Sequence, residues 1–550
     1  MTTSAHSTST FTTAHSKDNN HSDTLDALIV GAGFAGIYML YKLLNLGLKV
    51  QVIEEGSGVG GTWYWNRYPG ARCDVESMEY SYSFSKELLQ DWTWSHRYST
   101  QAEIMEYANH VVDTFGLRPY IKFNTKARSA HYDEARKEWE IKTDAGDLYR
   151  AHYNIMATGT LSSVNRPRFE GLDSFKGEWY LTGRWPKEGV DFSGKRVGII
   201  GTGSSAVQAT PVIAEQAGHL TVFQRTANYS IPARNEPLGA EEIDDIKANY
   251  PGIWARATKS RVGMGFIELG TKGALEATPE ERELEFSKRW AKGGAGFGAA
   301  YTDILSNEAA NETAAEYVKA KIREIVRDPI TAKILSPEIT LGCKRMCIDS
   351  GYYEAFNRDN VDLVDVGSAP IQRLVADGIQ TTDGEYQLDI IVFAMGFDAL
   401  TGALNAIDIR GRSGMALRDK WADGPRTYLG LASEGFPNMF TITGPGSPSV
   451  LSNVLRSIEH HVDWITDCIT FIKNSECSEI EANFTAEDEW TQHVEDVAKD
   501  TLRYKCDSWY VGANIPGKKR VFLPYSGGLP VYREKCQDVV SKGYEGFVVS

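Results

Sequence analysis

Gly31-Ala32-Gly33-Phe34-Ala35-Gly36 and Gly201-Thr202-Gly203-Ser204-Ser205-Ala206 are the two stretches that decide the fold of this 550-residue chain. Each follows a short strand-like run, residues 27–30 and 196–200, and each precedes a helix-like segment. In such a turn the first glycine permits the tight bend, the second lets the backbone approach a pyrophosphate, and the third small residue lets helix and strand pack. One turn is a weak signal, but two in this setting predict a chain that binds two dinucleotides.

The residue that follows the next strand separates the two sites. Glu54 comes after the strand-like run 49–53, and a carboxylate at this place accepts hydrogen bonds from an adenosine ribose. Arg225 and Thr226 hold the corresponding place after residues 220–223, where a guanidinium and a hydroxyl attract a 2′-phosphate. We therefore assign FAD to the first turn, with NAD left open there, and NADPH to the second. Two turns that bind no ligand are the competing interpretation.

Composition excludes several classes of function. Of the residues, 42% are hydrophobic and 24% charged, the net charge is −15, and no basic block points to nucleic acid or an anionic membrane as partner. No run reaches the roughly 18 apolar residues of a membrane span. The seven cysteines lack paired C-x-x-C spacing, which favours reduced thiols, and no histidine near Cys343 and Cys347 completes a metal site. We expect a soluble, cytoplasmic monomer without a metal.

The order of these patterns predicts an α/β fold with two Rossmann-like dinucleotide-binding domains, one inserted into the other. Their cleft should lie at the carboxyl ends of the parallel strands. The predicted segments are a disordered tail (1–24), the first segment of the FAD-binding domain (25–160), the first segment of the NADP-binding domain (161–235), a helical insertion (236–340), the second segment of the NADP-binding domain (341–390), and the second segment of the FAD-binding domain with a C-terminal loop (391–550).

An aromatic-rich segment connects the chain to a known family. It reads Gly60-Gly61-Thr62-Trp63-Tyr64-Trp65-Asn66-Arg67-Tyr68-Pro69-Gly70-Ala71-Arg72-Cys73-Asp74. This G-G-x-W-x-x-x-x-Y-P-G-x-x-x-D pattern resembles the long fingerprint of type I Baeyer–Villiger monooxygenases at every fixed position. The resemblance extends over nearly all of residues 26–550 and is closest to the phenylacetone and steroid monooxygenase branch. Segments around Arg345, Pro445 and Trp509 resemble the family's arginine stretch, a substrate-side loop and the C-terminal loop that closes on NADPH.

The resemblance implies a reaction and roles for individual residues. NADPH would reduce FAD, O2 would add to the reduced flavin at C4a, and the peroxyflavin would convert an aryl, cyclic or steroid-like ketone to an ester or lactone through a Criegee intermediate. Arg345 would stabilise the peroxide and the developing oxyanion, and Asp74 would orient it. Lys344 would join Arg225 and Thr226 at the 2′-phosphate, and Trp509 would bind the nicotinamide ribose. A purely structural ion pair is the competing interpretation of Arg345.

The full set of candidate cofactor-binding residues combines both turns, the fingerprint and these charged positions. They are Gly31, Gly33, Phe34, Ala35, Gly36, Glu54, Gly61, Thr62, Trp63, Arg72, Cys73, Asp74, Tyr80, Gly201, Thr202, Gly203, Ser204, Ser205, Ala206, Gln208, Arg225, Thr226, Lys344, Arg345 and Trp509.

One position departs from the family's pattern. The short fingerprint F-x-G-x-x-x-H-x-x-x-W-P is matched by Phe175, Gly177, Trp185 and Pro186, but Leu181 stands where histidine is expected. Because this histidine belongs to the linker between the nucleotide domains, its loss puts interdomain coupling in doubt more than the bond-making chemistry.

Three other functions remain open at this point. A flavin-containing or N-hydroxylating monooxygenase shares both nucleotide sites but oxidises sulfur or nitrogen; the long motif and the Lys344-Arg345 pair favour the Baeyer–Villiger interpretation. A two-dinucleotide disulfide-type reductase would need a redox cysteine pair near the flavin, where only Cys73 lies. A non-catalytic binding protein is disfavoured because both sites and the arginine are intact.

Overall fold

The first sheet gathers strands from both ends of the chain. The computed structural model describes residues 24–550, so nearly all of the predicted tail lies outside it. The strand order is β17-β4-β5-β6-β1-β2-β3, with β18 also paired to β6. The strands are β1 (Leu25–Val30), β2 (Val50–Ile53), β3 (Ile121–Lys122), β4 (Ala127–Asp133), β5 (Glu138–Thr143), β6 (Leu148–Met156), β17 (Asp408–Arg410) and β18 (Met439–Thr441).

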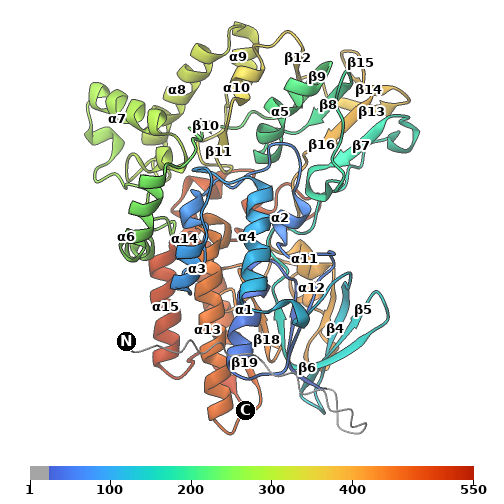
Figure 1. The fold of residues 1–550 in the computed structure, drawn as a ribbon, viewed down its shortest axis with the longest axis vertical. Coiled ribbons are helices and arrows are strands. Elements are labelled where there is room, and N and C mark those ends of the chain that lie inside the picture. The colour runs from blue at the N-terminus through green and yellow to red at the C-terminus, as the bar shows by residue number, and fades with distance from the viewer. Residues whose placement is uncertain (1–23) are drawn as a thin grey trace, which may run out of the picture.

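Helices from the same two regions of the chain stand together beside this sheet (Figure 1). Most of these helices share one core with β1 and β2, in which α1 lies against α13, whereas Leu404 of α11 and Leu417 of α12 belong to a second core with residues of β4 and β5. The helices are α1 (Phe34–Asn45), α2 (Thr62–Trp65), α3 (Lys86–Asp91), α4 (Gln101–Thr114), α11 (Gly402–Asn405), α12 (Leu417–Lys420), α13 (Val454–Asn474), α14 (Phe484–Lys499) and α15 (Leu529–Ser541).

The second sheet is parallel throughout, in the order β12-β9-β8-β16-β7. It comprises β7 (Glu178–Leu181), β8 (Arg196–Ile200), β9 (His219–Gln224), β12 (Val361–Asp365) and β16 (Ile390–Phe393), with helices α5 (Ser204–Gln216) and α10 (Tyr352–Ala355) and a small sheet of β13 (Ile371–Val375), β14 (Gly378–Thr381) and β15 (Glu385–Gln387). The predicted boundary at residue 390 is wrong, because it divides β16, which pairs with β8 and β7. The second unit therefore ends after Phe393.

A helical layer interrupts the second unit between β9 and β12, in the range predicted for the insertion. Two short parallel strands, β10 (Ser230–Pro232) and β11 (Cys347–Asp349), pair where the chain enters and leaves it. Its helices are α6 (Ala240–Lys259), α7 (Pro279–Lys292), α8 (Glu308–Ile325) and α9 (Pro329–Leu335). In Figure 1, α7, α8 and α9 lie at the upper left, above α14 and α15, and α6 runs down from them beside α14 toward α15.

The two chain crossings between the sheets run side by side. Val164 forms a bridge with Phe397, and the amide of Asp398 donates to the carbonyl oxygen of Ser163 at 2.9 Å. The amide of Leu400 likewise donates to Thr160 at 2.9 Å. The crossings therefore form one paired hinge rather than two independent linkers.

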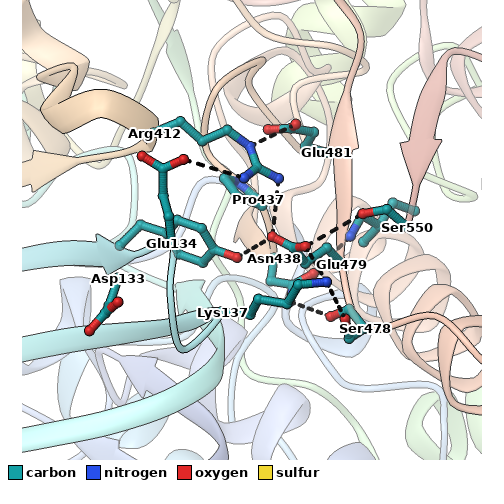
Figure 2. A network of polar contacts seen from close by, with 12 residues as sticks. Asp133, Glu134, Lys137, Arg412, Pro437, Asn438, Ser478, Glu479, Glu481 and Ser550 are labelled. Atoms are coloured by element: carbon teal, nitrogen blue, oxygen red, sulfur yellow. Dashed lines mark hydrogen bonds and ion pairs between the residues drawn. The ribbon is translucent and has the colours of Figure 1, made fainter.

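An ion-pair network fixes the C-terminal hairpin to the first sheet (Figure 2). The carboxylate of Glu479, which precedes β19 (Ile480–Ala482), lies 2.7 Å from Lys137 Nζ and 3.0 Å from Arg412 Nη2. Burial disfavours its charge, but Lys137 and Arg412 hold the pKa of Glu479 below its usual value. The backbone of Ser550, after β20 (Phe547–Val549), pairs with Glu479 as well. Glu479 thus connects the hairpin of β19 and β20 to the first sheet.

The expectation of reduced thiols is wrong for one pair of cysteines. Cys343 and Cys506 form a disulfide with their Cα atoms 5.6 Å apart. Their separation of 163 residues gives no local spacing signal, so only the fold brings them together. Within residues 24–550 there is neither a group of three metal-ligating side chains nor a helix with the length and apolar character to cross a membrane.

Candidate active site

The first glycine turn has the close approaches that its sequence predicts. Gly31 adopts a φ of 108°, and a Cβ atom there would lie 2.5 Å from the carbonyl oxygen of Ala157. A Cβ atom on Gly36 would lie 1.9 Å from the carbonyl oxygen of Gly31, so a larger residue would force α1 away from β1. Gly33, the N-cap of α1, touches Gly61 of the fingerprint. The N-terminus of α1, whose free amides favour a pyrophosphate, is therefore held next to the fingerprint.

Glu54 lies at the carboxyl end of β2, buried beside this turn. Its two carboxylate oxygens accept the amides of Ala32 at 2.7 Å and Gly56 at 2.6 Å. Burial raises the pKa of Glu54, and these two amides counteract the shift. Each oxygen keeps a further lone pair, so the carboxylate can still accept from a ribose hydroxyl.

A cavity of about 770 Å³ begins at this turn and is lined from both sheets. Trp63 donates its indole N–H to the hydroxyl of Tyr80 at 2.9 Å, and the Tyr80 ring stands edge-on to Phe34. The predicted residues in the lining are Gly31, Gly33, Phe34, Ala35, Glu54, Gly61, Thr62, Trp63 and Tyr80. Lining residues that the sequence motifs missed include Lys126, Arg166, Arg184, Thr443 and Ile458. These come from separate segments that only the fold brings together.

Among the missed residues, Arg184 joins the two units. It lies in the linker before β8, its guanidinium sits 3.9 Å from the centre of the Trp65 ring, and it pairs with Glu55 at 3.4 Å. A cation over a tryptophan face is a favourable contact. Its position directly before Trp185 of the short fingerprint is the one sequence signal that could have identified it.

The second turn repeats the geometry at the carboxyl edge of the second sheet. Gly201 has a φ of 122°, and a Cβ atom there would lie 2.4 Å from the carbonyl oxygen of Ala394. A Cβ atom on Gly203 would meet nothing within 4 Å, so its backbone is open to a phosphate. The Thr202 hydroxyl donates to the carbonyl oxygen of Thr226 at 2.7 Å and ties the turn to the end of β9.

Helix α5 contacts the fingerprint as well as the turn. The side-chain oxygen of Gln208 accepts from the Tyr68 hydroxyl at 2.7 Å, and its amide nitrogen donates to the carbonyl oxygen of Arg72 at 3.1 Å. A Cβ atom on Gly70 would lie 2.3 Å from the Gln208 carbonyl oxygen. Gln208 therefore joins the two units directly. The first turn of α5 contains the predicted residues Ser204, Ser205 and Ala206.

Two cations lie together at the end of β9 without a carboxylate partner. Lys344 is half-buried and Arg225 is exposed. Burial lowers the pKa of Lys344, and the charge of Arg225 lowers it further. In residues 24–550 neither side chain forms an ion pair or a side-chain hydrogen bond. Such a pair of like charges is suited to an anion.

Asp74 and Arg345 meet across the two units, as the sequence predicts. Arg345 Nε and Nη2 donate to the two carboxylate oxygens of Asp74 at 2.6 and 2.7 Å, and Nη1 donates to the carbonyl oxygen of Val450 at 3.0 Å. The charge of Asp74 raises the pKa of Arg345 against the effect of burial. Ser449, with a φ of 38°, adopts a left-handed conformation just before Val450. The guanidinium is thus fixed on three sides, although neither side chain belongs to the lining of the 770 Å³ cavity.

Comparisons with known proteins agree with this geometry. A family model described as "Pyridine nucleotide-disulphide oxidoreductase" matches residues 28–248. The chain is 45% identical to a Baeyer–Villiger monooxygenase of Pseudooceanicola batsensis, over 95% of this chain and 96% of that protein. It belongs to the type I Baeyer–Villiger monooxygenase family. A solved structure of oxidized steroid monooxygenase bound to NADP superimposes with a TM-score of 0.92 at 48% identity, covering 96% of this chain and 99% of that one.

A phenazine N-monooxygenase of Lysobacter antibioticus is 43% identical over 96% of this chain and 98% of that protein. Relatives of this Baeyer–Villiger monooxygenase thus include a protein named for oxidation at nitrogen. The disulfide-type reductase, by contrast, would need a redox-active cysteine pair near the first turn, and Cys73 in that region is a free, buried thiol. Burial raises the pKa of Cys73, so it stays protonated.

Two further predicted positions of the monooxygenase are placed by the fold. Leu181 ends β7 and contributes its apolar side chain to the 770 Å³ cavity, where the family's histidine would be expected. Trp509 begins a turn (η10, Trp509–Val511) whose next residue, Tyr510, is buried near Arg345. Within residues 24–550 the indole N–H of Trp509 has no acceptor.

Proposed function

We propose that this chain is an FAD- and NADPH-dependent Baeyer–Villiger monooxygenase that uses O2 to convert ketones to esters or lactones. The observation that carries the proposal is the Arg345–Asp74 pair, which joins the two nucleotide-binding units at their interface. When bound, NADPH supplies the hydride and FAD supplies the oxygen activation. Aryl, cyclic or steroid-like ketones are the proposed substrates.

Arg345 is proposed to stabilise negative charge that develops on the ketone oxygen and on activated oxygen. A guanidinium keeps its proton under all working conditions, so it supplies fixed positive charge without losing a proton. Asp74 and Val450 hold it in one orientation, and such preorganisation avoids a reorganisation cost during reaction. Asp74 is therefore a positioning residue in this proposal.

The two units are assigned to different cofactors. We assign the sheet that contains β1 to FAD, with Glu54 at the ribose, and the sheet that contains β8 to NADPH. Arg225 and Lys344, which form no ion pair within residues 24–550, are proposed to bind the 2′-phosphate together with Thr226. Trp509 is proposed to donate to the nicotinamide ribose. The cytoplasmic location and the monomeric state stay predictions.

The test is a ketone panel with NADPH and ¹⁸O2. We expect ester or lactone carrying one labelled oxygen, and Arg345→Ala should lower ester formation by about 100-fold or more. Ester formation by Arg345→Ala at close to the wild-type rate would contradict the role of this residue.

Oxidation at nitrogen is a second candidate, favoured by the phenazine N-monooxygenase relative. The same assay with a nitrogen heterocycle in place of the ketone distinguishes the two. An N-oxide product without any ester from the ketone panel would replace the first proposal with the second.

A further inference from the structure

The segment from Leu502 to Leu523, here called the C-terminal strap, crosses from the second unit to the hinge. At its start the amide of Leu502 donates to the carbonyl oxygen of Leu305 at 2.9 Å, and Arg503 Nε donates to Gly342 at 3.2 Å. Further along, the side chain of Asn514 donates to the carbonyl oxygen of Phe397 at 2.8 Å. The strap contains only short turns, so these contacts rather than its own secondary structure fix its path.

Lys518 makes the strongest of these contacts. Its Nζ lies 2.5 Å from a carboxylate oxygen of Asp398 and 2.7 Å from the hydroxyl of Thr401. The side chains of Lys518 and Asp398 are only 17% and 26% exposed. The lysine stem packs on Gly512, where a Cβ atom would lie 3.1 Å from Lys518 Cδ. A shielded, charge-assisted pair of this kind is worth more than a surface ion pair.

The next residue provides a built-in contrast. Lys519 lies 3.6 Å from Asp423, and their side chains are 59% and 96% exposed. Exposed pairs at this distance contribute little, because water and salt screen them. Two adjacent lysines therefore differ in burial and partner while sharing charge and place in the chain.

Asp398 belongs to the hinge between the units. Its backbone pairs with Ser163, and the neighbouring Leu400 pairs with Thr160; both Ser163 and Thr160 line the 770 Å³ cavity. The same crossing begins at Ala394, whose carbonyl oxygen lies so near Gly201 of the second turn that a Cβ atom there would be 2.4 Å away from it. Lys518 thus binds the short segment from Ala394 to Leu400, which contacts the second nucleotide turn at one end and residues of the cavity lining at the other.

We propose that Lys518 is a positioning residue, whose ion pair with Asp398 holds the C-terminal strap across the hinge and couples strap position to the relative placement of the two nucleotide sites. The inference rests on the function proposed above. In the coupled reaction NADPH, a proton, O2 and ketone give NADP⁺, water and ester. With the strap released, the same two electrons reduce O2 to H2O2, and NADPH is held less tightly.

The experiment compares Lys518→Met, Lys518→Arg and Lys519→Met in the full-length holoenzyme. We expect Lys518→Met to raise the KM for NADPH by about tenfold, which corresponds to 1.4 kcal/mol, and to raise H2O2 formed per NADPH oxidised by about threefold or more. Lys518→Arg keeps the charge and should restore both values to within about twofold of wild type. Lys519→Met should match wild type.

A double mutant distinguishes loss of the Lys518–Asp398 ion pair from a general loss of folding. If the pair acts as one unit, Asp398→Asn should reproduce Lys518→Met, and combining the two should add little further effect. FAD content and Tm are measured alongside to show that each variant is folded. Equal values for Lys518→Met and Lys519→Met, or a fall in kcat with unchanged KM and unchanged H2O2 yield, would overturn the inference.

Failure of the proposed function is distinguishable from failure of the inference. A wild-type enzyme that oxidises NADPH without forming ester would refute the proposed function. The KM and H2O2 comparisons among the lysine variants would still decide the role of Lys518.

Discussion

Replacing Arg225 and Lys344 together by alanine should raise the KM for NADPH by a large factor and leave the KM for NADH nearly unchanged. A hydrogen bond to an ionised group contributes about 1.5–3 kcal/mol. Because Arg225 is exposed and Lys344 half-buried, the low end applies to each, which gives about 3 kcal/mol for the pair. This corresponds to roughly 150-fold in affinity for the 2′-phosphate. NADH lacks this phosphate, so its KM should change by less than about threefold.

The assay is steady-state oxidation of NADPH and of NADH by wild type, the double variant and Arg358→Ala, an exposed arginine away from this pair. The two single variants apportion the effect. A double variant that retained the wild-type ratio of the two KM values would refute the assignment of the 2′-phosphate to these side chains. A loss shared equally by NADPH and NADH would do the same.

The pH dependence of binding provides an independent check on the same pair. Burial and the nearby charge of Arg225 lower the pKa of Lys344, and a bound phosphate favours its charged form. The affinity for NADPH should therefore fall as pH rises through this lowered pKa, at a lower pH than for an ordinary lysine. Arg225→Ala removes one cause of the shift and should move the fall to higher pH.

Three other outcomes follow from buried groups. Asp74→Asn should remove the carboxylate charge that fixes Arg345 and lower the ester yield about 100-fold. The rate of anaerobic flavin reduction, followed by absorbance, should change by less than about threefold, and equal losses in both quantities would contradict a positioning role. Cys506→Ser should open the 163-residue loop closed by Cys343 and lower the free energy of unfolding by at most about 5 kcal/mol relative to oxidised wild type, measured in urea, with reduced wild type as the control that should match the variant. No difference between oxidised and reduced wild type would exclude a stabilising disulfide. Burial raises the pKa of Glu79 from 4.5 to about 7, so the folded protein binds this proton more tightly than the unfolded chain does. The resulting contribution to stability is fully present below about pH 4.5 and is lost as pH rises through 7, a change on the order of 3 kcal/mol between pH 4.5 and 8. Glu79→Gln should abolish this pH dependence of the free energy of unfolding, and an unchanged dependence in urea titrations would exclude Glu79 as its source.

Much of the site was predictable because its signals are local. The glycines at 31 and 201 are required by φ angles and by contacts with the carbonyl oxygens of Ala157 and Ala394. Such requirements recur wherever a strand turns tightly into a helix, so they are visible in a single short stretch. The acidic residue after β2 follows from the same unit, because its position is set by the length of one helix and one strand.

Other features could not be predicted because several placements satisfy the same pattern. The buried run at residues 390–393 is equally compatible with either sheet, and only its hydrogen bonds to β8 and β7 assign it to the second. Arg184 was missed because nothing in its own segment reveals Trp65 and Glu55 as its partners. The disulfide was missed for the same reason.

The sequence by itself predicted that this chain binds two dinucleotides, and it carries the proposal of which turn takes which, because tight turns, helix starts and the residue after the next strand are encoded within about 30 residues. Only the tertiary structure decided how the two sites are joined. The pairs Arg184–Glu55, Cys343–Cys506 and Lys518–Asp398 connect positions more than 100 residues apart. Such contacts depend on how whole sheets and helices pack against one another, and no local pattern records that packing.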